Sequence, residues 1–160
     1  MPKDKHLHLV VRFSDTMFGM GDVVSLHNQI VSEQGFVWFG KLGQTISEMR
    51  INWINEQVEK KIPTHLYLVK GNRKKSTAYR ANLLAISRDE PENKKGYPAY
   101  YAEKELLQYI KVWMKIEKIE AIDMAEMSKL KALNSIFPIA ETLARSSSGY
   151  FLVHESKNIF

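Results

Sequence analysis

The sequence contains no cysteine, and this absence removes several classes of chemistry at once. A chain without cysteine forms no disulfide, offers no thiolate to a metal and has no cysteine nucleophile. It also lacks any apolar stretch of membrane-spanning length, because the run HLHLVV near the start ends at Arg12. That run is too short for a signal peptide, and no small-residue cleavage site follows it. We therefore expect a cytoplasmic protein with no membrane partner.

Familiar catalytic motifs are missing as well. The glycines of FGMGD, residues 18–22, lack the length and the lysine of a phosphate-binding loop. The serines at 146–148 lack the G-x-S-x-G pattern of a nucleophile elbow. Acid–lysine pairs such as Glu92 and Lys94 fall in an expected loop, whereas a metal-dependent nuclease carries its pair on a strand. We therefore predict that the protein is not an enzyme and uses no cofactor.

Two histidines form the one short-range candidate for a metal site. His6 and His8 lie on the same face of an extended strand, because strand side chains alternate. No third ligand is close to them in the sequence. The interpretation we favour is a pair of polar side chains on a solvated strand face, so we predict no metal site.

What the sequence does contain is typical of one globular domain with a positive charge. The chain has 160 residues, of which 44% are hydrophobic and 26% are charged. Its formal net charge is +5 and its sequence pI is about 9.3. This balance favours a polyanionic partner such as nucleic acid. We assign residues 1–155 to a single nucleic-acid-binding domain and residues 156–160 to a tail or the start of a linker.

The order of hydrophobic patterns predicts an α+β fold. Segments with strand character occur at 6–13, 36–41, 64–71, 77–88, 111–122 and 150–154. Segments with helical spacing or caps occur at 22–34, 45–62, 101–110, 123–133 and 140–145. We expect Asp22, Thr45 and Asp123 to cap the starts of three of them, and Gly35 to end the first. A break in alternation near Lys118 predicts a bulge or bend. Because strands and helices do not alternate regularly, we expect a curved mixed sheet or small barrel with helices outside.

A cluster of basic residues surrounds the turn between two of these strands. It comprises Lys70, Arg73, Lys74, Lys75 and Arg80, with Tyr79 interleaved and no acid among them. The flexible pair Gly71 and Asn72 allows a tight turn, so the cluster should project from a hairpin tip and contact phosphates. The alternative is a basic turn that is merely solvated.

The segment GFVWFGKLG, residues 35–43, places two large aromatic residues side by side. Because neighbours on a strand face opposite ways, Trp38 and Phe39 cannot have the same role. We expect Val37 and Phe39 to anchor the core. Trp38 would then face a binding pocket, with Gly40 leaving room for a base to approach.

The order of these segments resembles that of a known superfamily. FVWFGK, TISEMRINWINEQVEKK, THLYLVKGN and TAYRANLLAISR follow one another, and VWMKIEKIEAI and a late SSSG come after them. This order is similar to that of the EVE and YTH branch of the PUA-like superfamily. The resemblance extends over residues 36–155 and implies a PUA-like fold that holds a flipped base in an aromatic cage.

The same resemblance implies a set of site residues and a function. The base pocket would include Trp38, Phe39, Lys41, Asn72, Trp113, Ser146, Ser147, Ser148 and Gly149, while Lys70, Arg73, Lys74, Lys75, Tyr79 and Arg80 would hold the nucleic-acid backbone. The chain also resembles the DNA-reading domains of McrB-type modification-dependent restriction proteins. It would therefore read a modified, most simply methylated, base in double-stranded DNA and act with an AAA+ motor and a nuclease. Two alternatives stay open: a domain that reads modified RNA, and a protein-interaction module.

Overall fold

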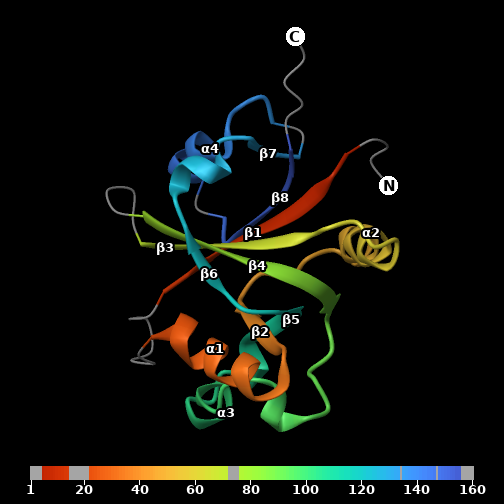
Figure 1. Cartoon of the computed structure of the whole chain (residues 1–160), viewed down its shortest axis with the longest axis vertical. Helices are drawn as coiled ribbons and strands as arrows, with labels where there is room; N and C mark the ends of the chain where they lie inside the picture. The colour runs from red at the N-terminus through yellow and green to blue at the C-terminus, as the bar shows by residue number, and fades with distance from the viewer. Residues whose placement is uncertain (1–4, 15–21, 72–75, 134, 147, 156–160) are drawn as a thin grey trace.

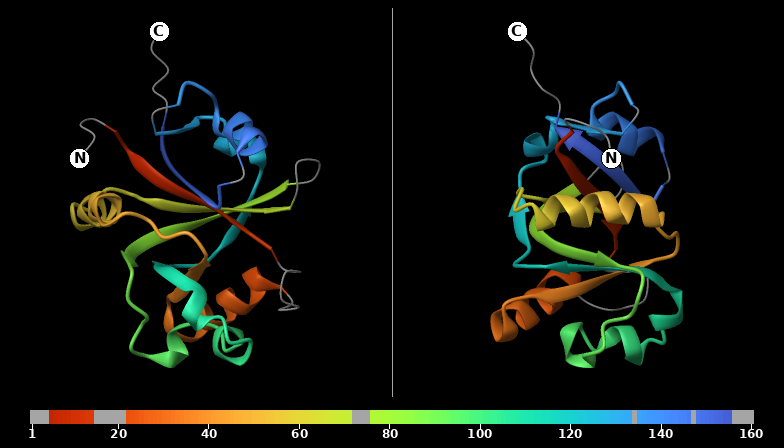
Figure 2. Two further views of the ribbon diagram at one scale, coloured as in Figure 1. Left: turned by 180° about the vertical axis from the view of Figure 1, so that it is seen from behind. Right: turned by 90° about the vertical axis from the view of Figure 1, so that its right-hand side faces the viewer.

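The fold is a strongly curved mixed sheet with helices on both sides (Figures 1 and 2). The computed structural model describes residues 5–14, 22–71, 76–133, 135–146 and 148–155. The strands are β1 (Leu7–Phe13), β2 (Val37–Leu42), β3 (His65–Gly71), β4 (Ser76–Ser87), β5 (Ile110–Ile116), β6 (Glu120–Ile122), β7 (Leu130–Ala132) and β8 (Tyr150–Glu155). The helices are α1 (Val23–Gln34), α2 (Glu48–Glu59), α3 (Tyr100–Glu103) and α4 (Ile139–Arg145), with 3-10 turns η1 (Lys94–Gly96), η2 (Leu107–Tyr109) and η3 (Met124–Met127). The predicted α+β class is confirmed.

The sheet joins the two ends of the chain through β1. Its strand order is β2-β5-β4-β3-β1-β8-β7, with β6 paired to β4. Strand β1 is parallel to β3, where Leu9 pairs with Leu66, and antiparallel to β8, where Leu9 pairs with Leu152. Both neighbours of β1 therefore come from segments far along the chain.

Helix α1 forms where its cap residues predict it. The side chain of Asp22 accepts a hydrogen bond from the Ser25 N–H at 3.2 Å, which satisfies one of the free N–H groups at the helix start. The helix ends at Gly35, whose φ of 89° is left-handed and whose N–H bonds the Val31 carbonyl. Both residues act as the sequence predicted.

Helix α2 starts later than predicted. Ser47 is its cap, and its hydroxyl accepts from the Arg50 N–H, whereas Thr45 was expected in that role. The helix also ends at Glu59, before Pro63, rather than at Ile62. Cap residues compete over two or three positions, and here Ile46, between Thr45 and Ser47, is buried just before the helix begins.

Two further predicted helices are mostly replaced by other structure. Residues 123–133 form only the turn η3 and then strand β7, because Leu130 and Ala132 alternate inward and pair with β8. Residues 101–110 contain part of α3 and the turn η2, separated by Glu105 at a φ of 57°. At residues 123–133, strand pairing therefore outweighs the local cap signal of Asp123.

The bend predicted near Lys118 is confirmed. It lies in the gap between the end of β5 and the start of β6.

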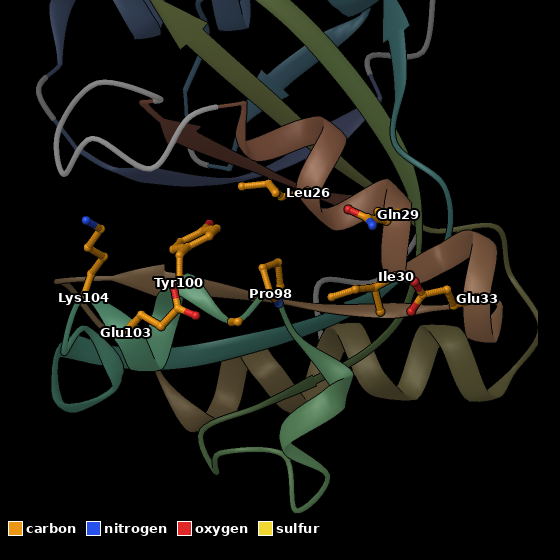
Figure 3. Close-up of a pocket in the computed structure, with 9 residues that line it drawn as sticks. Leu26, Gln29, Ile30, Glu33, Pro98, Tyr100, Glu103 and Lys104 are labelled. Carbon is orange, nitrogen blue, oxygen red and sulfur yellow. The ribbon is translucent and has the colours of Figure 1, made fainter.

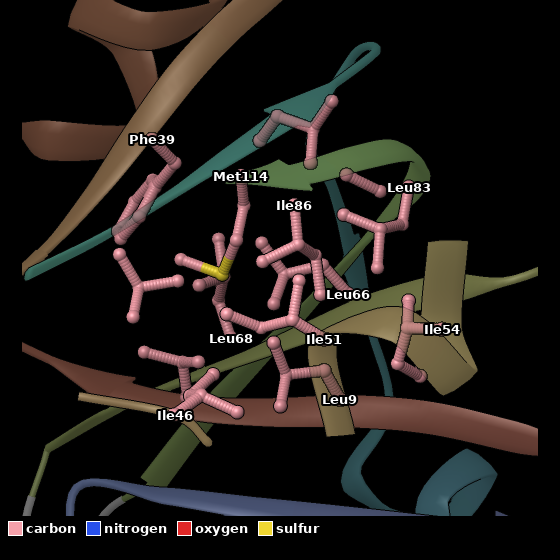
Figure 4. Packing of buried hydrophobic residues seen from close by; sticks show 14 of the residues in the cluster. Leu9, Phe39, Ile46, Ile51, Ile54, Leu66, Leu68, Leu83, Ile86 and Met114 are labelled. Atoms are coloured by element: carbon pink, nitrogen blue, oxygen red, sulfur yellow. The ribbon is translucent and has the colours of Figure 1, made fainter. Parts of the chain in front are cut away.

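Three clusters of buried side chains fill the layers. The main cluster lies between the concave face of the sheet and helices α1 and α2, and Figure 4 shows Phe39, Met114 and Leu68 converging there. A second cluster lies on the opposite face of β1, β3 and β8, under α4 and η3. A third, rich in aromatic residues, covers the outer face of β2 and β5 below α3. Strand β2 is therefore covered on both faces.

A chain of hydrogen bonds ties these layers together around β2. The Gly40 N–H donates to the Tyr101 hydroxyl at 3.0 Å, and that hydroxyl donates to Nε2 of His27 at 3.0 Å. The other ring nitrogen, Nδ1, donates to the Val23 carbonyl at 2.7 Å. Both nitrogens of the fully buried His27 ring thus have a hydrogen-bond partner in the neutral form. Burial accordingly lowers the pKa of His27 from 6.5 to about 4.

The two edge strands of the sheet, β7 and β2, are short or irregularly paired. Strand β7 has three residues, and beyond it Lys131 forms a single bridge with Pro138. At the other edge, the pairing of β2 with β5 shifts register between Lys41 and Leu42.

None of the helices in the described ranges has both the length and the apolar character needed to cross a membrane.

We predict that acid weakens the fold through His27. The pKa of His27 is about 4 in the folded chain and 6.5 is its ordinary value. Between these two pH values the unfolded chain therefore binds a proton at His27, whereas the folded chain does not. The free energy of unfolding should therefore fall as pH drops through the window, by about 2 kcal/mol at pH 5 relative to pH 8 for this ring. Urea unfolding of the wild type and of His27→Gln at both pH values measures it. An equal loss in the variant would show that the acid sensitivity arises elsewhere.

Candidate functional site

Strand pairing brings two predicted functional segments to one end of the sheet. Lys70, at the base of the β3–β4 hairpin, pairs with Phe13 at the end of β1. One residue earlier in β1, the Arg12 N–H donates to the Gly149 carbonyl at 2.9 Å. The basic hairpin and the 146–149 turn therefore lie on either side of the same strand end.

A cleft of about 250 Å³ opens beside this turn. Its lining comes from the start of α2 and the segment before it, and from β7, β8 and the residues next to them: Gln44, Arg50, Ala132, Leu133, Ser148, Tyr150, Phe151 and Leu152. The cleft is smaller than the roughly 300–1,000 Å³ of pockets that enclose whole drug-sized ligands. It therefore suits a single flat group better than a complete nucleotide.

Lys41 lies behind this cleft as a buried cation. Its side chain is 3% exposed, and its Nζ donates to the Gln44 carbonyl and lies 5.2 Å from the centre of the Tyr150 ring. A Cβ atom built on Gly149 would be 3.9 Å from Nζ. Among the described residues no carboxylate pairs with Lys41, and burial lowers its pKa from 10.5. A desolvated ammonium without a counter-charge is a costly feature that an acceptor-bearing ligand would compensate.

Arg12 and local hydrogen bonds hold the turn next to Lys41. The Arg12 guanidinium donates to the Ser146 carbonyl at 2.7 Å and also to the Leu143 carbonyl. Within the turn, the Ser148 hydroxyl donates to the Tyr150 carbonyl at 2.8 Å, and the Ser148 N–H donates to the Ser146 hydroxyl at 3.2 Å. The predicted residues Lys41, Ser146, Ser148 and Gly149 are thus brought together.

Lys70 and Tyr79 form a second cation–aromatic pair on the same side of the sheet. The Lys70 Nζ lies 5.9 Å from the centre of the Tyr79 ring, which in turn lies 5.9 Å from the ring of Phe13. Arg80, by contrast, follows Tyr79 on β4 and faces the other way. It lines a separate cleft of about 420 Å³ on the other face, together with Glu117, Lys118 and Glu120. The expectation that Arg80 shares a phosphate-binding surface with Lys70 is therefore wrong.

Trp38 does not face the cleft beside the 146–149 turn. The alternation predicted for β2 is confirmed: Val37 and Phe39 are buried in the main core, and Trp38 is on the other face. Lys41, however, lies on the Phe39 face, so Trp38 and Lys41 belong to opposite sides of the strand. Trp38 packs in the aromatic cluster, where its Cδ1 lies 3.2 Å from a Cβ built on Gly96.

Three other residues that the sequence placed at the pocket are instead packed in the protein interior. Trp113 is 1% exposed beneath the rings of Tyr97 and Tyr101, and Phe39 is 4% exposed against the ring of His27. Neither presents a surface on which a base could stack. A Cβ on Gly40 would lie 2.8 Å from Cδ1 of Ile110, so this glycine makes room for the core and not for a ligand.

Asn72, Arg73, Lys74, Lys75 and Ser147 lie outside the described residues. Their assignments to the pocket and to the nucleic-acid backbone stay predictions.

The histidines near the N-terminus form a partly buried cluster with Glu155, contrary to the solvated strand face that we expected. The ligating atoms of His6, His8 and Glu155 lie within 4.8 Å of one another, and His8 is fully buried. Nδ1 of His8 accepts from the His65 N–H at 3.0 Å, so the neutral ring carries its proton on Nε2 and donates it to Glu155 at 3.1 Å.

This hydrogen-bond pattern opposes metal binding at His8. A metal on Nε2 would require the proton on Nδ1, where it would meet the N–H of His65. Burial and the nearby His6 lower the pKa of His8 from 6.5 to about 4, which keeps the ring neutral. The cluster is therefore a hydrogen-bonded link from β1 to the end of β8, and Lys129 completes it through an ion pair of 3.3 Å with Glu155.

The largest of the three clefts lies elsewhere, between α1 and the segment around α3 (Figure 3). It has a volume of about 500 Å³, with Leu26, Ile30 and Pro98 among its apolar lining. Glu33 and Glu103 also line it, and none of the residues predicted from the sequence does. Lys104 lines it too, but the two carboxylates leave the lining with a net negative charge that would repel phosphate, so we do not assign nucleic-acid binding to this cleft.

Sequence reasoning missed Tyr150, Arg50 and Gln44. Tyr150 directly follows the SSSG segment, and this neighbour relation was the one available signal for it. Arg50 and Gln44 lie more than ninety residues before that segment, and only the tertiary fold brings them to the cleft.

One comparison with known proteins identifies a relationship. A family model described as Pua-like matches residues 9–159, which is almost the whole chain. No curated protein and no solved structure gives a significant match.

We predict that Gly40→Ala destabilises the fold by about 1–3 kcal/mol, because the new methyl overlaps buried side chains. The nearest atoms would be Cδ1 of Ile110 at 2.8 Å and Cζ3 of Trp113 at 3.2 Å. Gly149→Ala is the matched control, since its nearest contact is Nζ of Lys41 at 3.9 Å. Chemical denaturation of both variants provides the comparison. Equal stability of the two would contradict a packing role for Gly40.

Proposed function

This chain belongs to the Pua-like family, and from that premise we propose that it is a non-catalytic domain that recognises a modified base in double-stranded DNA. Membership of the family indicates a nucleic-acid-binding module. The finer assignment is that a base, most simply a methylated one, flips out of the duplex into the cleft beside the 146–149 turn. We assign the protein to the specificity module of a modification-dependent restriction system, in which an AAA+ motor and a nuclease act after recognition.

The observation that supports this proposal most is the pairing of Lys41 with Tyr150. Lys41 is a buried cation with no described carboxylate partner. The ring of Tyr150 contacts its ammonium group and also lines the cleft. An aromatic ring offers a stacking surface to any base, while an ammonium group donates to base carbonyl oxygens or ring nitrogens. The two together provide stacking and a polar contact for one flipped base.

The energies involved are compatible with this role. Flipping a base costs a few kcal/mol in lost stacking and pairing. Stacking on an aromatic side chain returns about 1–3 kcal/mol, and a hydrogen bond to a charged group about 1.5–3 kcal/mol. A single methyl group adds only about 0.8 kcal/mol of apolar contact. Discrimination of a methylated base should therefore be modest unless the shape of the cleft excludes the wrong base.

The DNA backbone would be held next to the cleft by the base of the β3–β4 hairpin. Lys70 lies at the same end of the sheet as the turn, with Tyr79 beneath it. The predicted contacts of Arg73, Lys74 and Lys75 would extend this surface toward the hairpin tip. Arg80 is left out, because it faces a separate cleft on the other side of the sheet, next to Glu117 and Glu120.

We predict that Lys41→Met weakens binding to a modified duplex by about 10- to 100-fold, because one charge-assisted hydrogen bond is lost. The melting temperature should stay unchanged or rise, since the substitution removes a buried cation and keeps its volume. Fluorescence anisotropy would use matched duplexes with and without one 5-methylcytosine or N6-methyladenine, and single-stranded RNA.

A lower melting temperature of the Lys41→Met variant with unchanged binding would show that Lys41 has a structural role. Preferential RNA binding would favour the RNA-reading alternative, and no binding to either nucleic acid at low salt would favour the protein-interaction alternative.

We predict that Lys70→Ala reduces affinity for modified and unmodified duplexes alike. Each lost phosphate contact lowers the slope of log affinity against log salt by about 1. Lys94→Ala is the matched control, because Lys94 is an exposed lysine of η1 and is not part of the proposed surface. Binding titrations over a range of salt concentrations measure the slopes. A change in modification preference at a constant slope would exclude the backbone role.

A further inference from the structure

Two large apolar residues are exposed side by side just before α4. Ile136 is 83% exposed and Phe137 is 37% exposed, and the exposed Pro138 follows them. Ile136 is the most exposed large hydrophobic residue in the described part of the chain. Single exposed apolar side chains are common, and the Arg145 guanidinium partly covers Phe137, whereas Ile136 gains almost no burial from the fold. Their position therefore suggests a contact with another molecule.

Backbone contacts hold this pair in one conformation. The Ser135 N–H donates to the Ala132 carbonyl at 3.0 Å, and the Phe137 N–H donates to the Ser135 hydroxyl at 3.1 Å. The bridge between Lys131 and Pro138 closes the segment behind them. Ile136 is thus presented by a hydrogen-bonded turn, so little ordering entropy remains to be lost on binding.

The turn is adjacent to the cleft on two sides. Ala132 and Leu133, from which the turn emerges, are part of the cleft lining. The guanidinium of Arg145 lies 4.6 Å from the centre of the Phe137 ring, and Arg145 directly precedes Ser146 of the 146–149 turn. Ile136 is therefore close to the place where a flipped base would leave the duplex.

We propose that Ile136 is a wedge that enters the base stack when the target base flips into the cleft. This inference rests on the proposed function. Proteins that distort DNA commonly insert isoleucine, phenylalanine or proline between base steps, where the apolar side chain replaces lost stacking. Phe137 is the next residue of the turn, and Arg145, whose side chain is 63% exposed, is paired with Glu141 at 2.9 Å and would exchange this partner for a phosphate.

The test compares duplexes in which flipping is easy or difficult. Ile136→Ala should weaken binding to a fully paired duplex with one 5-methylcytosine by about tenfold, because nothing then fills the vacated stack. The same variant should bind a duplex with a mismatch at the target, and single-stranded DNA, as tightly as the wild type, because the base is already unstacked. Ile136→Met, which keeps an apolar side chain, should restore most of the loss. The fluorescence of 2-aminopurine at the target reports flipping directly.

Ile62→Ala is the matched control, because Ile62 is another exposed isoleucine, at 37%, that follows the end of α2 and does not line the cleft. It should change none of these affinities. Equal losses of Ile136→Ala on paired and mismatched duplexes would overturn the wedge and leave a simple surface contact. Unchanged affinity on every duplex would exclude Ile136 from DNA binding. If the wild type binds no DNA, the proposed function and the wedge both fail, whereas wild-type binding with no Ile136 effect removes the wedge alone.

Discussion

The position of β1 between β3 and β8 determines where the candidate site lies. One of these pairings is parallel and the other antiparallel, so the end of β3 and the start of β8 both lie at the end of β1. This places Lys70 opposite Phe13 and the Gly149 carbonyl on the N–H of Arg12. Segments about eighty residues apart in the chain thereby form one surface, as the crossing of β1, β3 and β8 in Figure 1 shows.

The sequence was informative where structure is decided locally. Asp22 and Gly35 mark the two ends of α1 because a cap needs only its own neighbours along the chain. The alternation of Val37, Trp38 and Phe39 was equally readable, since it follows from strand geometry. The Pua-like architecture could also be recognised, because the order of elements survives errors in their boundaries.

The sequence was misleading where the decisive partner is distant. Trp38 was expected at a pocket because a strand pattern identifies two faces but does not say what covers each one. Here the aromatic cluster around Tyr101 and Trp113 covers the second face, and its residues come from more than fifty positions later. The role of Tyr150 was missed for the same reason, since its significance depends on Lys41 lying behind it. Local propensity also failed at β7, where pairing with β8 replaced an expected helix.

The short, irregular edges of the sheet have a consequence for behaviour at high local concentration. An open sheet presents unpaired N–H and C=O groups at its two outermost strands, and these can recruit a strand from another molecule. Here β7 has only three residues and Pro138, which has no N–H to offer, bridges its outer side. The register shift in β2 interrupts the opposite edge. Copies of the protein at high concentration would therefore find few places on β2 and β7 at which to join edge to edge, although the sheet is not closed into a barrel.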